Sequence, residues 1–376
     1  MNINSILKKE GISVIGQLNT LEINKIASSI SAKLCKAFPE HSLDQSNLFI
    51  AIARLNMYVA NMPHDNAFAK YCYFNDSIYF NQKMDLNNLN DIALHECIHY
   101  LQGVRKENGK LARLGLYDLD SFRPMGEALN EAAVQEMASV AVNTPTDTVR
   151  YYNMDFSTNS PDYYPVETAI INQMTFFTGT YPLYHSTLYS NDIFKNTFIA
   201  KTSSTVYDQV VRNLDQIMEY ENNLSKVSYK LSVSSIELRL DKVKKYNSML
   251  HDIKEVIKKK TLETQELILT SCFNNSLAQV RTLEDIDEIQ GKLADFKNVL
   301  ITTDDYNYYD EYALFLSTKL EEKKSFIEKY GNILQMNAVT NELANVEQHS
   351  YGYTFFKNLF KKMKLLLEEK IREKDF

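Results

Sequence analysis

The sequence predicts an α+β N-terminal half followed by a mainly α-helical C-terminal bundle. All seven prolines fall between Pro39 and Pro182, so the last 194 of the 376 residues contain none. Because proline interrupts helices, its absence indicates that this half is nearly all helix. The N-terminal half combines helical stretches with a run of β-favouring residues from Tyr71 to Asn81. This mixture is typical of the α+β class.

The N-terminal elements follow from local residue patterns. Glu22 to Lys36 and Asp44 to Ala60 are predicted to be helices, since their apolar residues recur at helical spacing. Tyr71 to Asn81 is predicted to form two short strands. Asn75 and Asp76 would form the turn between them, because both residue types tolerate the positive φ values of a tight hairpin.

A third helix is predicted from about Leu86 to Gln102. Asp85 is suited to cap its start, and Gly103 is suited to end it. The motif HECIH, His95 to His99, lies in the last two turns of this helix.

The C-terminal half carries the apolar stripe of an amphipathic helix, with Leu240, Leu250 and Ile257 at spacings that keep them on one face. Polar clusters predict helix breaks at 271–275 and 302–310. The length of the chain supports about two domains. We divide it into an α+β domain at 1–200 and an all-helical accessory domain at 201–376.

Composition limits the classes of function. The net charge is −7, with 44% hydrophobic and 24% charged residues, as in an ordinary globular protein rather than one that binds nucleic acid. The first thirty residues lack the apolar core of a secretory signal, and no stretch reaches eighteen apolar residues. We therefore expect a cytoplasmic protein without stable membrane insertion. Its four cysteines contain no CxxC pair, which argues against a cysteine-based zinc site.

The HECIH motif indicates a zinc site. Residues four apart project from one face of a helix, so His95 and His99 lie about 6 Å apart along its axis and can share one ion. Zinc accepts imidazole nitrogens, and a catalytic site typically has three protein ligands and one water. Glu96 lies about 100° around the helix from His95. There it can act as general base on that water.

A third ligand is expected from the segment Met125 to Met137, a predicted helix with acidic residues at Glu127, Glu131 and Glu136. HECIH followed by Asn130-Glu131-Ala132-Ala133, with Glu131 32 residues after His99, resembles the gluzincin clan of zinc peptidases. In that clan a glutamate on a second helix completes the site. The resemblance therefore implies a zincin-like domain, a Zn²⁺ cofactor and Glu131 as the third ligand.

Local spacing also favours Glu131. Gln135, one helical turn further on, could accept a hydrogen bond from the far nitrogen of a ligating histidine, although the clan more often has an acid there. Glu127 is the alternative ligand, since Glu131 would then occupy the supporting position. The gluzincin resemblance further implies a tyrosine or histidine that stabilises the transition state. Tyr163, Tyr164 and His185 are the candidates, and we favour Tyr164.

These residues together predict a zinc peptidase that acts on a peptide or protein substrate. The resemblance places that substrate along a sheet edge, for which the hairpin at Tyr71 to Phe80 is suited. The C-terminal helices would restrict access or bind a protein partner. Two alternatives stay open: a non-catalytic helical scaffold with a structural or degenerate zinc domain, and a toxin-like protease delivered into another cell.

Overall fold

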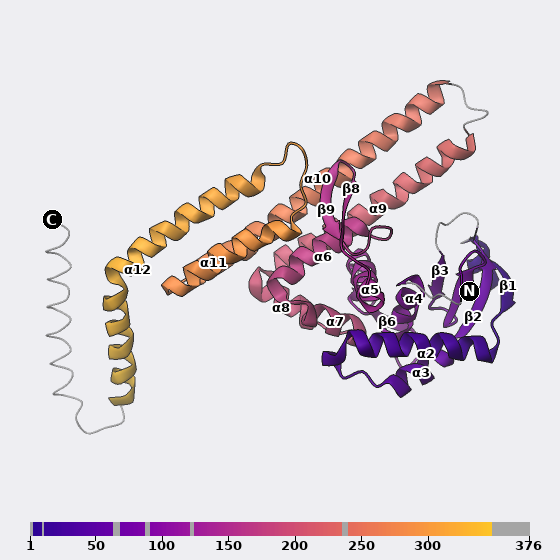
Figure 1. Cartoon of the computed structure of the whole chain (residues 1–376), viewed down its shortest axis with the longest axis horizontal. Coiled ribbons are helices and arrows are strands. Elements are labelled where there is room, and N and C mark those ends of the chain that lie inside the picture. Colours follow the sequence, from indigo (N-terminus) through magenta and orange to yellow (C-terminus); the bar gives the residue numbers. More distant parts are fainter. Residues whose placement is uncertain are drawn as a thin grey trace. The chain divides into compact units, whose positions relative to one another are not determined.

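The computed structural model describes residues 3–9, 11–62, 68–86, 91–120, 124–234 and 240–347, and it has a mixed α+β architecture. Small sheets occupy the N-terminal half, and long helices follow them, as the sequence predicts (Figure 1). The expected hairpin, the helix at 22–36 and the helix carrying Glu131 are all confirmed. The zincin fold itself is a finer statement, which belongs with the proposed function.

The largest sheet has four strands in the order β1-β2-β4-β3. β2 pairs with β4 in parallel, whereas the β1–β2 and β3–β4 pairs are antiparallel. β3 therefore lies at one edge, joined to β4 by a tight turn in which Asp76 has a φ of 48°. The strands are β1 (Ser13–Gln17), β2 (Asn56–Asn61), β3 (Ala69–Cys72) and β4 (Ser77–Asn81). Smaller sheets are formed by β5 (Gly103–Arg105), β6 (Leu111–Leu114) and β7 (Tyr117–Asp118), and by β8 (Asp147–Tyr151) and β9 (Met154–Thr158).

A helical layer packs against these strands around a large apolar core. α4 contacts both α5 and the edge strand β3, and α5 in turn contacts α2, α6, α7 and α9. The central position of α5 follows from its sequence, because alanines and apolar residues cover most of its surface and are buried. The helices of this part are α1 (Ile3–Lys9), α2 (Thr20–Ala37), η1 (Pro39–His41), α3 (Gln45–Ala53), α4 (Asp91–Leu101), α5 (Glu127–Val142), α6 (Pro165–Thr178), α7 (Thr180–Tyr189) and α8 (Ile193–Lys201).

Two long helices, α9 (Ser204–Ser234) and α10 (Leu240–Gln279), run alongside one another (Figure 1), and the buried Asn213 amide on α9 donates a hydrogen bond to Thr264 on α10. They are followed by α11 (Leu283–Asp295), η2 (Phe296–Val299) and α12 (Tyr308–Glu347). The chain forms two compact units: residues 1–278 with 291–313, and residues 279–290 with 314–376. The first unit contains α9, whose apolar face is buried in the core that surrounds α5. The boundary at residue 200 stays a prediction.

Three sequence predictions are wrong in detail. Residues 56–60, expected to be helical, form β2, because Met57 and Ala60 are buried there by sheet pairing. The expected break at 271–275 lies inside α10, where Cys272 and Phe273 are buried. Asp85 and Leu86 are not helical, residues 87–90 lie outside the described residues, and α4 is described from Asp91 onward. The expected break at 302–310 is confirmed in part, because residues 300–307 separate η2 from α12.

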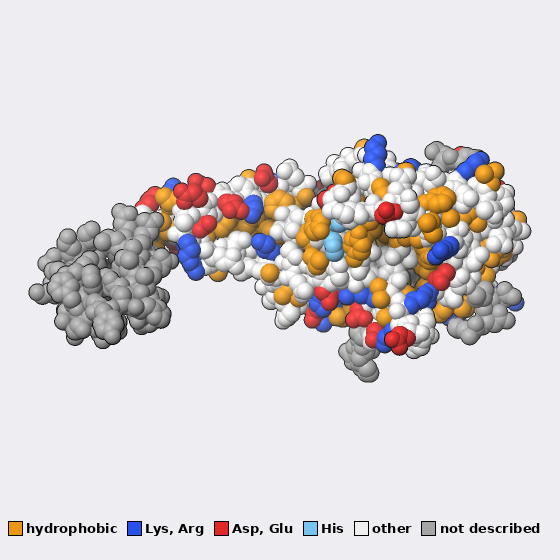
Figure 2. All heavy atoms as spheres, turned by 90° about the horizontal axis from the view of Figure 1, so that it is seen from below, with side chains coloured by type: hydrophobic (Ala, Val, Ile, Leu, Met, Phe, Trp, Pro, Cys, Tyr) orange, Lys and Arg blue, Asp and Glu red, His pale blue; other side chains and the backbone are white. Residues whose placement is uncertain are grey.

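The surface carries both charge signs. On the face shown in Figure 2, acidic and basic side chains are interspersed among polar and apolar ones. Among the residues that the structure describes, no helix is long and apolar enough to cross a membrane.

Candidate metal centre

The two motif histidines share one face of α4. His95 and His99 are only 6% and 7% exposed, and their Nε2 atoms lie 2.9 Å apart. This proximity follows from the four-residue spacing within one helix. The predicted placement of both histidines on one face of the helix is confirmed. Both rings lie against α5 rather than in solvent.

Glu131 on α5 completes a three-residue cluster. Its Oε2 atom lies 3.1 Å from His95 Nε2 and 3.3 Å from His99 Nε2. In a tetrahedral zinc site with bonds of about 2.0 Å, ligand atoms are separated by roughly 3.3 Å. The three distances in the cluster are close to this value. Among the described residues, His95, His99 and Glu131 are the group whose ligand atoms converge in this way.

Hydrogen bonds to Gln135 fix the tautomer of His95. The Nδ1 atom of His95 lies 3.0 Å from Gln135 Oε1, and Gln135 Nε2 donates to Asp91 Oδ2 at 2.9 Å. A carboxylate only accepts hydrogen bonds, so the amide group of Gln135 must face Asp91 and its carbonyl must face His95. His95 therefore carries its proton on Nδ1, and the lone pair of Nε2 points into the cluster.

A second amide network fixes His99 in the same tautomer. Its Nδ1 atom lies 3.1 Å from Gln102 Oε1, and Gln102 Nε2 donates to the backbone carbonyl of Thr187. Asn130 pairs with the amide of Gln102 through two hydrogen bonds and also accepts one from the backbone N–H of Leu116. Because the carbonyl and the N–H have fixed polarity, both amides have only one favourable orientation. His99 thus also presents an unprotonated Nε2.

The electrostatics of the cluster call for a positive charge, which without a metal is a proton on the histidines and which a metal ion would replace. Burial opposes the charged form of each group. For His99 the Glu131 carboxylate outweighs burial and raises the pKa to about 9, while the two histidines lower the pKa of Glu131 well below its usual value. Two imidazole lone pairs and a carboxylate are a donor set that Zn²⁺ accepts. The residues present therefore fit a zinc ion.

The cluster opens into a cavity of about 570 Å³. Its walls come from β3, α4, α5, α9 and the loop before α6. Glu96 lines it on the α4 side, outside the ligand group, and its Oε2 accepts a hydrogen bond from the backbone N–H of Tyr71 on β3. The general-base candidate, the edge strand and the metal cluster therefore share one cavity.

Tyr164 also lines this cavity. Its ring stacks on His95 with centroids 6.0 Å apart and an interplanar angle of 11°. Tyr164 caps α6 in the left-handed region, with φ 50° and ψ 42°, directly before Pro165. Such backbone strain is common at functional sites. Burial and the carboxylates of Glu131 and Glu96 raise its pKa well above the usual value, so the phenol keeps its proton and can donate it in a hydrogen bond.

The remaining candidates have other positions. Tyr163 also lines the cavity, whereas His185 does not: it lies on α7, where its ring is 5.9 Å from that of His41. Glu127 lines the cavity wall but does not belong to the ligand cluster. Partial burial and the Glu131 and Asp215 carboxylates raise the pKa of Glu127.

Sequence reasoning missed Asp91 and Gln102. Asp91 precedes His95 by four residues and Gln102 follows His99 by three, so both lie on the histidine face of the helix. This spacing could have identified them. Gln135 on α5 was predicted as the acceptor for a ligating histidine, and the contact with His95 confirms it. Asn130, the α5 partner of Gln102, was not predicted, since that contact depends on how α4 and α5 pack.

Comparison with protein-family models, with curated proteins and with solved structures found no match to this chain.

Proposed function

We propose that the protein is a zinc-dependent peptidase of the gluzincin type, with His95, His99 and Glu131 as the ligands. One observation carries the proposal. Three ligand atoms from α4 and α5 lie within 3.3 Å of one another, beside a cavity that is also lined by Glu96, the motif glutamate outside the ligand group. A structural zinc site is usually closed by four protein ligands, whereas a catalytic site keeps one position open. The open cavity therefore supports catalysis over a purely structural role.

Zinc in such a site acidifies a water molecule and polarises a substrate carbonyl. Glu96 has the position of the general base: it takes a proton from the attacking water and delivers it to the leaving amine. The hydroxyl group of Tyr164 stays protonated and donates a hydrogen bond to the oxygen that becomes negative in the transition state. The buried histidine networks hold both rings in the ligating tautomer throughout.

The substrate is proposed to be an extended peptide bound along β3. Phe68 to Tyr71 line the cavity, and among the described strands β3 pairs with β4 alone. Strand edges are a common place for an extended peptide to bind through its backbone. The hydrogen bond from Tyr71 to Glu96 ties this edge to the proposed base.

The test of metal binding compares wild type with Glu131→Ala and Glu127→Ala. Both glutamates line the same cavity and lie one turn apart on α5, so Glu127→Ala is a matched control. We expect one zinc per chain in wild type and in Glu127→Ala, and loss of zinc in Glu131→Ala, measured by elemental analysis after dialysis. Full zinc occupancy in Glu131→Ala, or its loss only in Glu127→Ala, would contradict the ligand assignment.

The test of catalysis uses Glu96→Gln with a peptide library as substrate. This variant should keep its zinc, because Glu96 is not a ligand, while hydrolysis falls by a factor of about 10² to 10⁴. Undiminished hydrolysis in Glu96→Gln would refute the assigned role. Zinc binding without hydrolysis of any peptide in the wild type would favour the non-catalytic scaffold.

A further inference from the structure

Asp91 has a defined place beside the metal centre. It is the first residue of α4, four residues before His95 and therefore on the same helix face. Gln135 reaches from α5 into the space between them, with Oε1 3.0 Å from His95 Nδ1 and Nε2 2.9 Å from Asp91 Oδ2. The three side chains form one hydrogen-bonded chain from the cluster to a carboxylate.

The middle link of this chain is immobilised. Gln135 is 1% exposed, and its Nε2 atom lies 3.3 Å from Ser139 Oγ as well as near Asp91. Asp91 is held in turn, because its other oxygen, Oδ1, accepts a hydrogen bond from the backbone N–H of Ile92. Rotation of the Gln135 amide would place its N–H groups against His95 and its carbonyl against the carboxylate, which is unfavourable. The chain therefore has a single polarity.

We infer that Asp91 is a positioning residue for the zinc site, which acts on His95 through the side-chain amide of Gln135. The inference rests on the proposed zinc binding. A carboxylate at position 135 could accept the hydrogen bond from His95 Nδ1 directly, but this chain has the amide of Gln135 there. Asp91 supplies the negative charge instead, through its hydrogen bond with Gln135. Hydrogen bonds in such a chain polarise one another, so the charge strengthens the bond from His95 to Gln135 and makes Nε2 a better ligand.

The two histidines are supported differently. His99 is held by amides and a backbone carbonyl, all of which are neutral. His95 is held by an amide that is itself bound to a charge. Loss of such outer partners typically lowers metal affinity by about 10- to 100-fold. The carboxylate of Asp91 should thus have a measurable effect on zinc affinity even though no ligand is changed.

The experiment measures zinc affinity by competition with a chelator in the full chain, for Asp91→Asn, Gln135→Glu and the double variant. Asp91→Asn removes the charge and leaves one acceptor oxygen, which can still accept from Gln135 while the backbone N–H of Ile92 loses its partner. We expect its affinity to fall about 10-fold. Gln135→Glu alone should also weaken binding, since two carboxylates then face each other at about the present 2.9 Å. The double variant moves the charge directly onto His95 and should recover most of the wild-type affinity.

This recovery separates positioning from a merely structural role. Asp91 also lies at the start of a helix, and loss of a helix-terminal charge destabilises folding without being rescued from another helix. Asp44→Asn is the matched control, because Asp44 caps α3 through the backbone N–H of Asn47 and does not line the cavity. Its zinc affinity should equal that of wild type.

The same affinities test the role of Asp91 separately from zinc binding itself. Wild-type affinity in Asp91→Asn, or a double variant no better than Gln135→Glu alone, would overturn the role of Asp91 and leave the zinc site intact. Absence of zinc binding in the wild type would overturn both.

Discussion

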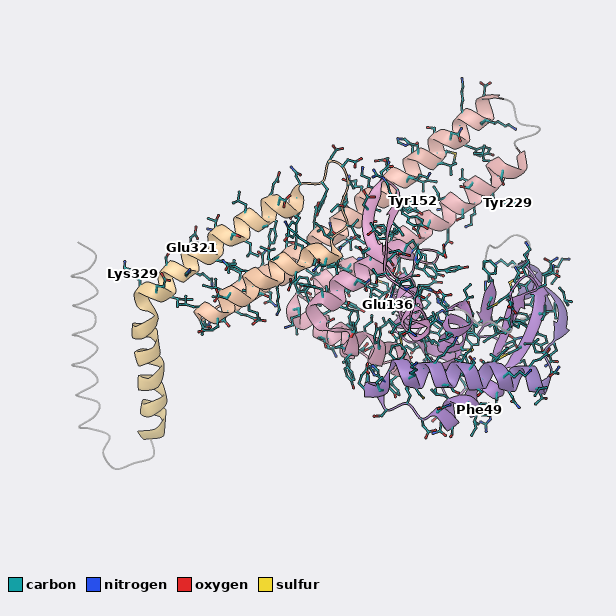
Figure 3. The ribbon with its side chains drawn as sticks, viewed as in Figure 1. Phe49, Glu136, Tyr152, Tyr229, Glu321 and Lys329 are labelled. Atoms are coloured by element: carbon teal, nitrogen blue, oxygen red, sulfur yellow. The ribbon has the colours of Figure 1, made fainter. Side chains whose placement is uncertain are left out.

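Three glutamates of α5 show how position alone changes a carboxyl group. Glu131 faces the two histidines, which hold its pKa well below the usual value, whereas the pKa of Glu127 is raised by burial and by neighbouring carboxylates. Glu136 lies among the packed helices (Figure 3), 7% exposed, and burial raises its pKa to about 7. One of its oxygens accepts a hydrogen bond from Asn159, and the other has no partner.

This buried carboxyl group predicts a pH-dependent stability. Glu136 is protonated in the folded state up to about pH 7 but ionises near pH 4.5 when unfolded. The stability it contributes is complete below pH 4.5 and is lost as the pH rises through 7. Glu136→Gln keeps the shape without the charge, so the variant should be more stable than wild type at pH 8 by on the order of 1–3 kcal/mol.

Chemical denaturation at pH 5 and pH 8 checks this prediction. The difference between the two proteins should grow with pH between these values. If Glu136→Gln is less stable than wild type by the same amount at pH 5 and pH 8, then Glu136 is ionised in the folded protein and its carboxylate is fully hydrogen-bonded.

The sequence predicts the proposed ligands because their chemistry is local. His95 and His99 need only one helix, and Glu131 follows from the resemblance of a second motif. Spacing also places Gln135 near a histidine and Asp91 on the histidine face of α4, but the hydrogen bond that joins Gln135 to Asp91 depends on the packing of α4 against α5. Tyr164 could be proposed as one of several aromatic residues, but its stacking on His95 depends on the left-handed backbone at the start of α6.

At the scale of elements, a turn packs against the residues that surround the proposed metal site. Gly115 lies between β6 and β7 with a φ of 53°, and a Cβ atom there would be 2.3 Å from both Asn130 Oδ1 and Gln102 Nε2. The turn therefore packs directly on the amide pair that orients His99. Only glycine allows this approach.

Gly115→Ala should therefore weaken zinc binding, by about tenfold or more, because the amide pair must move and His99 loses its fixed tautomer. Gly109→Ala is the matched control: its φ is 77°, but nothing lies within 4 Å of the added atom. It should cost about 1–2 kcal/mol of stability from the left-handed backbone alone. Zinc affinity and thermal unfolding, measured for both variants, separate the two effects. Equal zinc affinities would show that the close approach of the turn is unimportant.

Elements were predicted best where one segment determines its own structure. The hairpin at Tyr71 to Asn81 has both strand-forming residues and a turn sequence, and it forms as expected. The predictions for β2 and the middle of α10 were wrong because the secondary structure of both segments depends on contacts with residues far away in the sequence. Met57 is buried by pairing with other strands, and Phe273 packs against Phe177 and Phe296, which stabilises helix across a polar stretch.

At the scale of the whole molecule, α9 is part of the site's support. α5 begins at Gly126, which provides no side-chain cap. Asp215 of α9 accepts hydrogen bonds from the backbone N–H groups of Gly126 and Ala128 at 2.9 and 3.0 Å. These are donors that the helix itself leaves unpaired, and a carboxylate there also interacts favourably with the helix dipole. The helix that carries Glu131 is thus capped by a residue beyond position 200.

The position of α9 makes the predicted boundary at residue 200 testable by truncation. A chain ending at Ala313 keeps the whole unit formed by 1–278 and 291–313 and should bind zinc with wild-type affinity. A chain ending at residue 200 loses Asp215 and the buried Val210, Val211, Leu214 and Ile217. Burial of each such side chain contributes about 1.5–3 kcal/mol, so the total rivals the stability of a typical domain.

We therefore expect the chain of 200 residues to unfold without cooperativity and to bind no zinc, as measured by thermal denaturation and elemental analysis. Asp215→Asn in the full chain tests the contribution of the cap separately, since it removes the charge and one of the two acceptor oxygens. It should lower stability by about 1–3 kcal/mol and leave zinc binding in place. If the chain of 200 residues folds and binds zinc as wild type does, α9 belongs to an accessory domain, and the boundary at residue 200 stands.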